Sequence, residues 1–91
     1  MSETFAEFES RHRALGYTEV LERRWEPGAA VGTHTHAWDA TAVVVKGDMW
    51  LTVGAATVHI VPGGGFDVDR GTAHAERYGS EGTLLWAARR H

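Results

Sequence analysis

The stretch Gly28-Ala-Ala-Val-Gly-Thr-His34-Thr-His36 determines how the rest of this 91-residue chain is interpreted. Two histidines separated by one residue point to the same side of an extended strand, because strand side chains alternate with a period of two. Two imidazoles on one side can bind a single divalent transition metal. A third ligand must come from a later segment, and His74, which follows a glycine-rich turn, is the candidate.

The length and composition predict one small globular domain, residues 1–91, with a thin core. The chain is 43% hydrophobic and contains four tryptophans, which is typical of folded rather than disordered proteins. The net charge of −3 argues against nucleic acid as the main partner, and we expect a small-molecule substrate instead. Because a small all-β domain gains buried area by association, we also expect a homodimer.

The chain contains no cysteine, which excludes disulfides, thiolate metal ligands and a cysteine nucleophile. The longest apolar run, Leu84–Ala88, is far too short to span a membrane. Residues 1–4 do not begin the pattern of a signal peptide, in which a basic region precedes an apolar one. We therefore expect a cytoplasmic protein without a membrane partner.

Hydrophobic periodicity divides the chain into a short helix followed by strands. Residues 4–15 predict the helix, with Thr4 and Glu7 forming a capping box and Gly16 at its end. The period then changes to two, which assigns residues 1–16 to a helical segment and 17–91 to a β-domain. Seven or eight short strands predict a sandwich or barrel, with a hairpin at Gly47-Asp48. These strands are expected at 18–26, 31–36, 40–46, 49–53, 57–61, 66–69, 73–78 and 83–90.

Two short motifs resemble those of the cupin superfamily, in particular its small single-domain members, the monocupins. The first cupin motif has a glycine, a His-x-His pair and a final glycine, matched here by Gly28, His34, His36 and Gly47. The second motif has a glycine, a Pro-x-Gly unit and a histidine, and Gly63, Gly71 and His74 match it. The chain departs from this motif at the proline, which is Asp69, and at the terminal asparagine, which is Tyr78. The resemblance covers nearly the whole chain from residue 19. It implies an all-β, cupin-type β-barrel, also described as a double-stranded β-helix or jelly roll, after a short N-terminal helix.

The chain departs from the cupin pattern at the acidic ligand. The family has a carboxylate four or five residues after the His-x-His pair, where this chain has Ala40 and Thr41. Asp39 lies one residue early, and only a bulge or loop before Ala40 would turn it inward. Glu76 lies two residues after His74 and shares its face in a regular strand. Both acids are candidate catalytic residues, and either can be a fourth ligand or can fix a histidine tautomer.

We predict that His34, His36 and His74 bind one divalent transition metal, and Fe, Mn, Ni, Co, Cu and Zn all accept imidazole ligands. The alternative is a polar pocket without metal, which the resemblance allows for some cupins. We expect aromatic side chains in the walls of the pocket, because they bury the largest area per residue. The candidate substrate-pocket residues are Trp38, Trp50, Tyr78 and Arg70, the last as a partner for a substrate carboxylate.

An open three-histidine metal site can act as a Lewis acid, support O₂-dependent chemistry or lower the pKa of bound water. The resemblance implies a dioxygenase, isomerase, cyclase or lyase that acts on a small organic molecule, and we favour a dioxygenase. A protein that only binds a small molecule, with or without metal, is the alternative from another class.

Overall fold

The computed structural model describes residues 3–91, in which one helix precedes eight strands. The predicted all-β fold with a short N-terminal helix is confirmed, and the predicted strand ends lie within two residues of the observed ones. In chain order the elements are α1 (Phe5–Ala14), β1 (Glu19–Trp25), β2 (Ala30–His34), β3 (Asp39–Lys46), β4 (Met49–Val53), β5 (Ala56–Ile60), β6 (Gly65–Val68), β7 (His74–Tyr78) and β8 (Thr83–Arg90).

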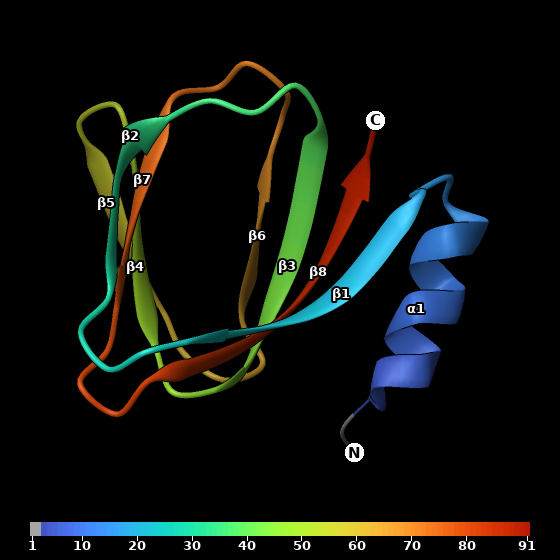
Figure 1. Ribbon diagram of the computed structural model, residues 1–91, viewed down its shortest axis with the longest axis horizontal. Coiled ribbons are helices and arrows are strands. Elements are labelled where there is room, and N and C mark those ends of the chain that lie inside the picture. The colour runs from blue at the N-terminus through green and yellow to red at the C-terminus, as the bar shows by residue number, and fades with distance from the viewer. Residues whose placement is uncertain (1–2) are drawn as a thin grey trace.

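The strands form two four-stranded antiparallel sheets that face each other (Figure 1). One sheet has the order β1-β8-β3-β6 and the other has the order β2-β7-β4-β5. The architecture is therefore a jelly roll, as expected. The two sheets are not closed into the predicted continuous barrel, because among the described residues no strand of one sheet pairs with a strand of the other.

The turn at Gly47-Asp48 is not the predicted hairpin. β3 pairs with β6 and β8, whereas β4 pairs with β5 and β7, so this turn carries the chain from one sheet to the other. A hairpin and a crossing between sheets both need a tight turn, and only the long-range pairing distinguishes them. The turn at Gly54 does close a hairpin, in which Val53 pairs with Ala56.

The helix α1 covers the outer face of the sheet that contains β1 and β8 (Figure 1). Its predicted capping box is present, because the backbone N–H of Glu7 donates to the Thr4 hydroxyl and that of Thr4 donates to the Glu7 carboxylate. The rings of Phe5 and Phe8 lie 5.7 and 6.0 Å from the ring of Trp86 on β8. This helix is neither long nor apolar enough to cross a membrane. The expected homodimer and cytoplasmic location stay predictions.

The main hydrophobic core lies between the two sheets. Tyr78, Val68 and Leu85 belong to this core and also line the cavity described below, so the site rests directly on packed side chains. The buried members of the core are Val44, Met49, Leu51, Ile60, Val68, Tyr78 and Leu85.

Substituting Gly47 with alanine is expected to destabilise the fold strongly. Gly47 has a φ of +75°, and an added Cβ would overlap the carbonyl oxygen of Gly82 in the turn before β8. A left-handed backbone costs a non-glycine residue about 1–2 kcal/mol. The backbone overlap adds to that cost, so we expect urea unfolding to show a loss of roughly 3 kcal/mol or more.

Gly54→Ala is the matched control for this substitution. Gly54 has a φ of +59°, but nothing lies within 4 Å of the added Cβ. Only the backbone cost of about 1–2 kcal/mol is therefore expected. Equal losses in the two variants would mean that the close approach to Gly82 is not the reason for a glycine at position 47.

Candidate metal centre

A β-bulge in β2 positions the first histidine of the site. His34 pairs directly with His74 across β2 and β7, but the register shifts between Val31 and His34. Regular alternation would put Val31 and His34 on opposite faces. The register shift brings both to the same cavity, where His36 joins them two residues after β2.

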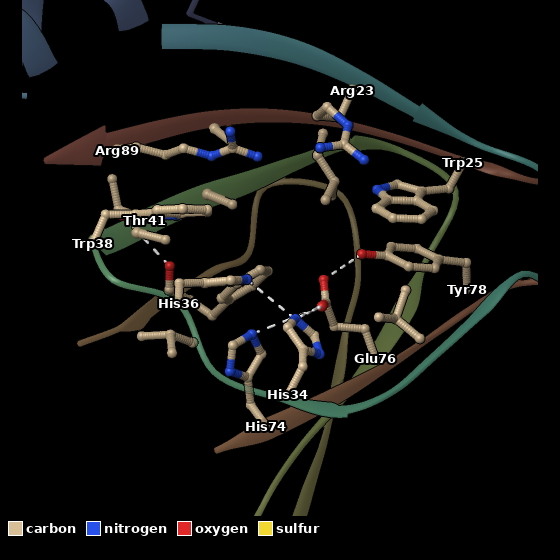
Figure 2. Close-up of a pocket in the computed structure, with 17 residues that line it drawn as sticks. Arg23, Trp25, His34, His36, Trp38, Thr41, His74, Glu76, Tyr78 and Arg89 are labelled. Atoms are coloured by element: carbon tan, nitrogen blue, oxygen red, sulfur yellow. Dashed lines mark hydrogen bonds and ion pairs between the residues drawn. The ribbon is translucent and has the colours of Figure 1, made fainter. Parts of the chain in front are cut away.

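The three imidazole rings meet between the sheets (Figure 2). Ring centroids are separated by 4.3 Å for His34 and His74, 4.7 Å for His36 and His74, and 4.8 Å for His34 and His36. One nitrogen from each ring lies within 4.8 Å of the nitrogens from the other two. The structure thus brings together the three histidines that the sequence motifs indicated.

Backbone carbonyls set the tautomers of two of these rings. Nδ1 of His34 lies 2.7 Å from the carbonyl oxygen of Gly32, and Nδ1 of His74 lies 2.9 Å from that of Thr72. A carbonyl oxygen only accepts, so each Nδ1 carries the proton and each Nε2 keeps a free lone pair. Nε2 of His34 is also 3.1 Å from Nε2 of His36, a separation that needs a proton or a cation between two lone pairs. This arrangement of donors fits a divalent transition metal.

His36 is held against an aromatic wall. Its ring lies parallel to that of Trp38, with centroids 4.7 Å apart and an angle of 5° between the planes. Burial lowers the pKa of His36, and the charges of His74 and His34 act in the same direction. A lower pKa keeps the imidazole in its neutral form, which is the form that binds metal.

Glu76 provides a carboxylate beside the metal-binding nitrogens. Its Oε2 lies 3.5 Å from Nε2 of His34 and 3.8 Å from Nε2 of His74, and its side chain is only 12% exposed. Its other oxygen, Oε1, accepts a hydrogen bond of 2.5 Å from the hydroxyl of Tyr78. Glu76 therefore lies where a fourth ligand or a proton acceptor would be needed.

Asp39, the other candidate acid, lies outside this cluster. Its Oδ1 accepts from the backbone N–H of Arg70 at 2.9 Å, and its Oδ2 lies 3.4 Å from Nε of Arg90. The Arg70 N–H, with help from the guanidinium groups of Arg70 and Arg90, holds the pKa of Asp39 below its usual value. No bulge turns the start of β3 inward, so the structure brings only Glu76 to the histidines.

The histidines line a cavity of about 300 Å³ that lies between the two sheets. Of the predicted pocket residues, Trp38 and Tyr78 line it, whereas Trp50 and Arg70 do not. Arg70 is bound to Asp39, as described above. Trp50 alternates with the buried residues of β4 and therefore lies on the outer face, where its ring stacks on His59 at 4.5 Å. The remaining walls are mainly apolar and comprise Val31, Ala40, Thr41, Ala42, Phe66, Val68, Leu85 and Ala87.

The cavity is also lined by three large side chains that the sequence motifs did not indicate, Arg23, Trp25 and Arg89. Strand alternation contained a signal for them. Arg23 points to the same side of β1 as Trp25, and Arg89 points to the same side of β8 as Leu85. An arginine on the face of a strand that carries apolar side chains indicates a polar group inside the fold.

Tyr78 is expected to stay protonated at a pH where exposed phenols ionise. Burial raises its pKa above the usual 10.0, and the neighbouring Glu76 carboxylate acts in the same direction. The pKa of Tyr78 is higher in the folded state than in the unfolded state. The buried, neutral phenol therefore contributes fully to stability below the unfolded pKa, and this contribution decreases as the pH rises above it. At pH about 11, phenolate absorbance should be equal in folded wild-type protein and in folded Tyr78→Phe. A smaller absorbance in the variant would mean that Tyr78 ionises normally.

Comparisons with known proteins agree with this fold. A family model described as "Cupin domain" matches residues 21–88. A protein of unknown function from Rhizobium leguminosarum bv. viciae 3841 is 25% identical with a TM-score of 0.74, over 78% of this chain and 67% of that one. KdgF from Halomonas sp. is 18% identical with a TM-score of 0.68, over 79% of this chain and 68% of that one.

A third structure, one of the crystal structures of the DMSP lyases RdDddP and RnDddQII, is 23% identical with a TM-score of 0.71. The match covers 79% of this chain but only 37% of that one. No curated protein matches the chain. At such identities the solved structures establish the shared fold, and the chemistry must be argued from the site itself.

Proposed function

Since this chain belongs to the cupin family, we propose that it is a metal-dependent enzyme that acts on a small organic molecule. The observation that carries the proposal is the convergence of one nitrogen from each of His34, His36 and His74 within 4.8 Å. These residues would hold a divalent transition metal, which would supply Lewis-acid chemistry to a substrate oxygen beside it. The adjoining cavity of about 300 Å³ has room for a small substrate.

We rank proton-transfer chemistry, as in a lyase or isomerase, ahead of the dioxygenase reaction that the sequence favoured. Glu76 has one oxygen beside the histidine nitrogens, while the Tyr78 hydroxyl holds the other oxygen. A carboxylate held in this way can take a proton from a substrate carbon or from water and can return it later. This pair supports proton transfer directly, whereas the three histidines suit Lewis-acid and O₂ chemistry alike, so the carboxylate decides the ranking.

The proposal is tested first by metal analysis of protein purified without a histidine tag. We expect about one divalent metal per chain, with anomalous scattering at the metal edge close to the three histidines. Protein that binds no metal under any loading condition would overturn the proposal.

The reaction class is tested with the metal-loaded protein and a panel of β-diketones, thiols, aromatic diols and DMSP, with oxygen uptake measured in parallel. Turnover without oxygen uptake is the expected result. Oxygen uptake coupled to turnover would restore the dioxygenase assignment. Tight, reversible binding without turnover would instead indicate a protein that only binds a small molecule.

A further inference from the structure

We propose that the cavity binds small organic acids, with the ligand carboxylate held by Arg23 and Arg89 opposite the three histidines. The inference rests on the proposed function in one respect, because the bound acid would be the substrate of that site. Arg23 lies on β1 and Arg89 on β8, in the sheet that faces β2 and β7. Figure 2 shows both guanidinium groups across the cavity from His34 and His74.

Arg23 is positioned by aromatic stacking rather than by an acid. Its Cζ lies 4.7 Å from the ring centroid of Trp25, and Trp25 stacks on Tyr78 at 4.5 Å with the planes 8° apart. Within residues 3–91, the Arg23 guanidinium has neither an ion pair nor a hydrogen bond to a protein group. A half-buried guanidinium without a partner is costly, and a ligand anion would supply that partner.

Arg89 is positioned in the same manner on the other side of the cavity. Its Cζ lies 4.9 Å from the ring centroid of Trp38, the tryptophan that stacks on His36. Nη1 of Arg89 also lies 3.3 Å from a carboxylate oxygen of Glu19, whose side chain is 44% exposed. This ion pair is at the rim, so it leaves other guanidinium N–H groups available to the cavity. Because stacking already orders both arginines, less conformational entropy is lost when a ligand binds.

The cavity offers more hydrogen-bond donors than acceptors. Among the described residues, the Arg23 guanidinium donates to no protein group, and the Arg89 guanidinium donates only through Nη1, to Glu19. Guanidinium groups only donate. The free acceptors of the cavity, Oε2 of Glu76 and the histidine Nε2 atoms, lie together at the metal centre and not beside the arginines. The ligand must therefore bring acceptors, and a planar carboxylate matches the fork of a guanidinium.

The size and walls of the cavity limit which anion fits. Its volume of about 300 Å³ is at the lower end of the range for ligand pockets. Apolar side chains such as Val31, Phe66 and Val68 form much of the wall. These features favour a small acid with a compact hydrocarbon part over a phosphorylated sugar or a nucleotide.

The test is calorimetric titration of metal-free and metal-loaded protein with short aliphatic and aromatic monocarboxylates, each compared with its primary amide. Wild-type protein should bind the acids about tenfold or more tightly than the amides, because hydrogen bonds to charged groups are the stronger ones. Arg23→Gln and Arg89→Gln should each weaken acid binding about tenfold and change amide binding by less than about twofold. Metal content should stay unchanged in both variants.

Arg24→Gln is the matched control, since Arg24 is exposed and lies 3.8 Å from Glu22, away from the cavity. This variant loses the same charge and should bind acids as tightly as the wild type. If a glutamine variant fails to fold, Arg23→Lys and Arg89→Lys replace it. They keep the charge but lose the fork, so they should still bind acids measurably more weakly.

Three results would overturn the inference: no preference for acids over amides, a preference that survives the arginine substitutions, or tighter binding of inorganic phosphate than of any carboxylate. Failure of the proposed function is a separate result. In that case acids would bind through the arginines while the protein takes up no metal or catalyses no reaction.

Discussion

The double variant His34→Ala/His36→Ala is expected to lose measurable binding of divalent metal. Each substitution removes an imidazole from a group whose nitrogens lie within 4.8 Å of one another, which leaves His74 and the Glu76 carboxylate. Loss of a residue that only orients a metal ligand already costs about 10–100-fold in affinity. Loss of two ligands should therefore lower the affinity by well over about 100-fold. Elemental analysis after dialysis against a defined metal buffer measures the effect.

His59→Ala is the control for this double variant. His59 lies on the outer face of β5, where it pairs with Asp48 at 2.7 Å, outside the cavity. The His59→Ala variant also lacks an imidazole, so any non-specific metal binding by surface histidines is lost in both experiments. Wild-type metal content in the double variant, or a comparable loss in His59→Ala, would contradict the three-histidine site.

Replacing Glu76 with glutamine is expected to have the second-largest effect. The amide keeps the shape of the side chain and can still accept from Tyr78, but it loses the charge beside His34 and His74. Metal affinity should fall by about 10–100-fold if Glu76 is a ligand or orients one. Any turnover found for the protein should fall by about 10²–10⁴-fold if Glu76 transfers the proton. Isothermal titration with metal and steady-state assays separate the two contributions.

Asp39→Asn tests the other candidate acid, which lies beside the first motif. Asp39 is bound to Arg70 and Arg90 rather than to the histidines, so metal affinity should stay within about twofold of wild type. Its pKa is lowered in the folded state, so its contribution to stability is complete above the unfolded pKa and is lost as the pH falls. A variant with normal stability and lost metal binding would reverse the roles that we assign to Asp39 and Glu76.

Local sequence patterns were sufficient to predict much of the fold and the metal-binding side of the site. The capping box of α1 and the strand positions follow from short-range hydrogen bonding and from the alternation of side chains. The grouping of His74 with Glu76 follows from the same alternation along β7, whereas His36 lies two residues beyond β2 and reaches His34 through the loop. Such relations hold wherever the strand is placed in the molecule.

Pairing between distant strands determined the rest. The bulge that turns His34 toward His74, the crossing at Gly47 and the outward position of Trp50 all depend on which strands lie side by side. The same holds for Arg23 and Arg89, which reach the cavity because β1 and β8 are neighbours in the sheet opposite the histidines. Alternation tells which residues of a strand share a face, but which of the two faces is buried depends on the sheet packed against it. Tertiary structure therefore completed the site by adding two arginines and Trp25 around the three histidines.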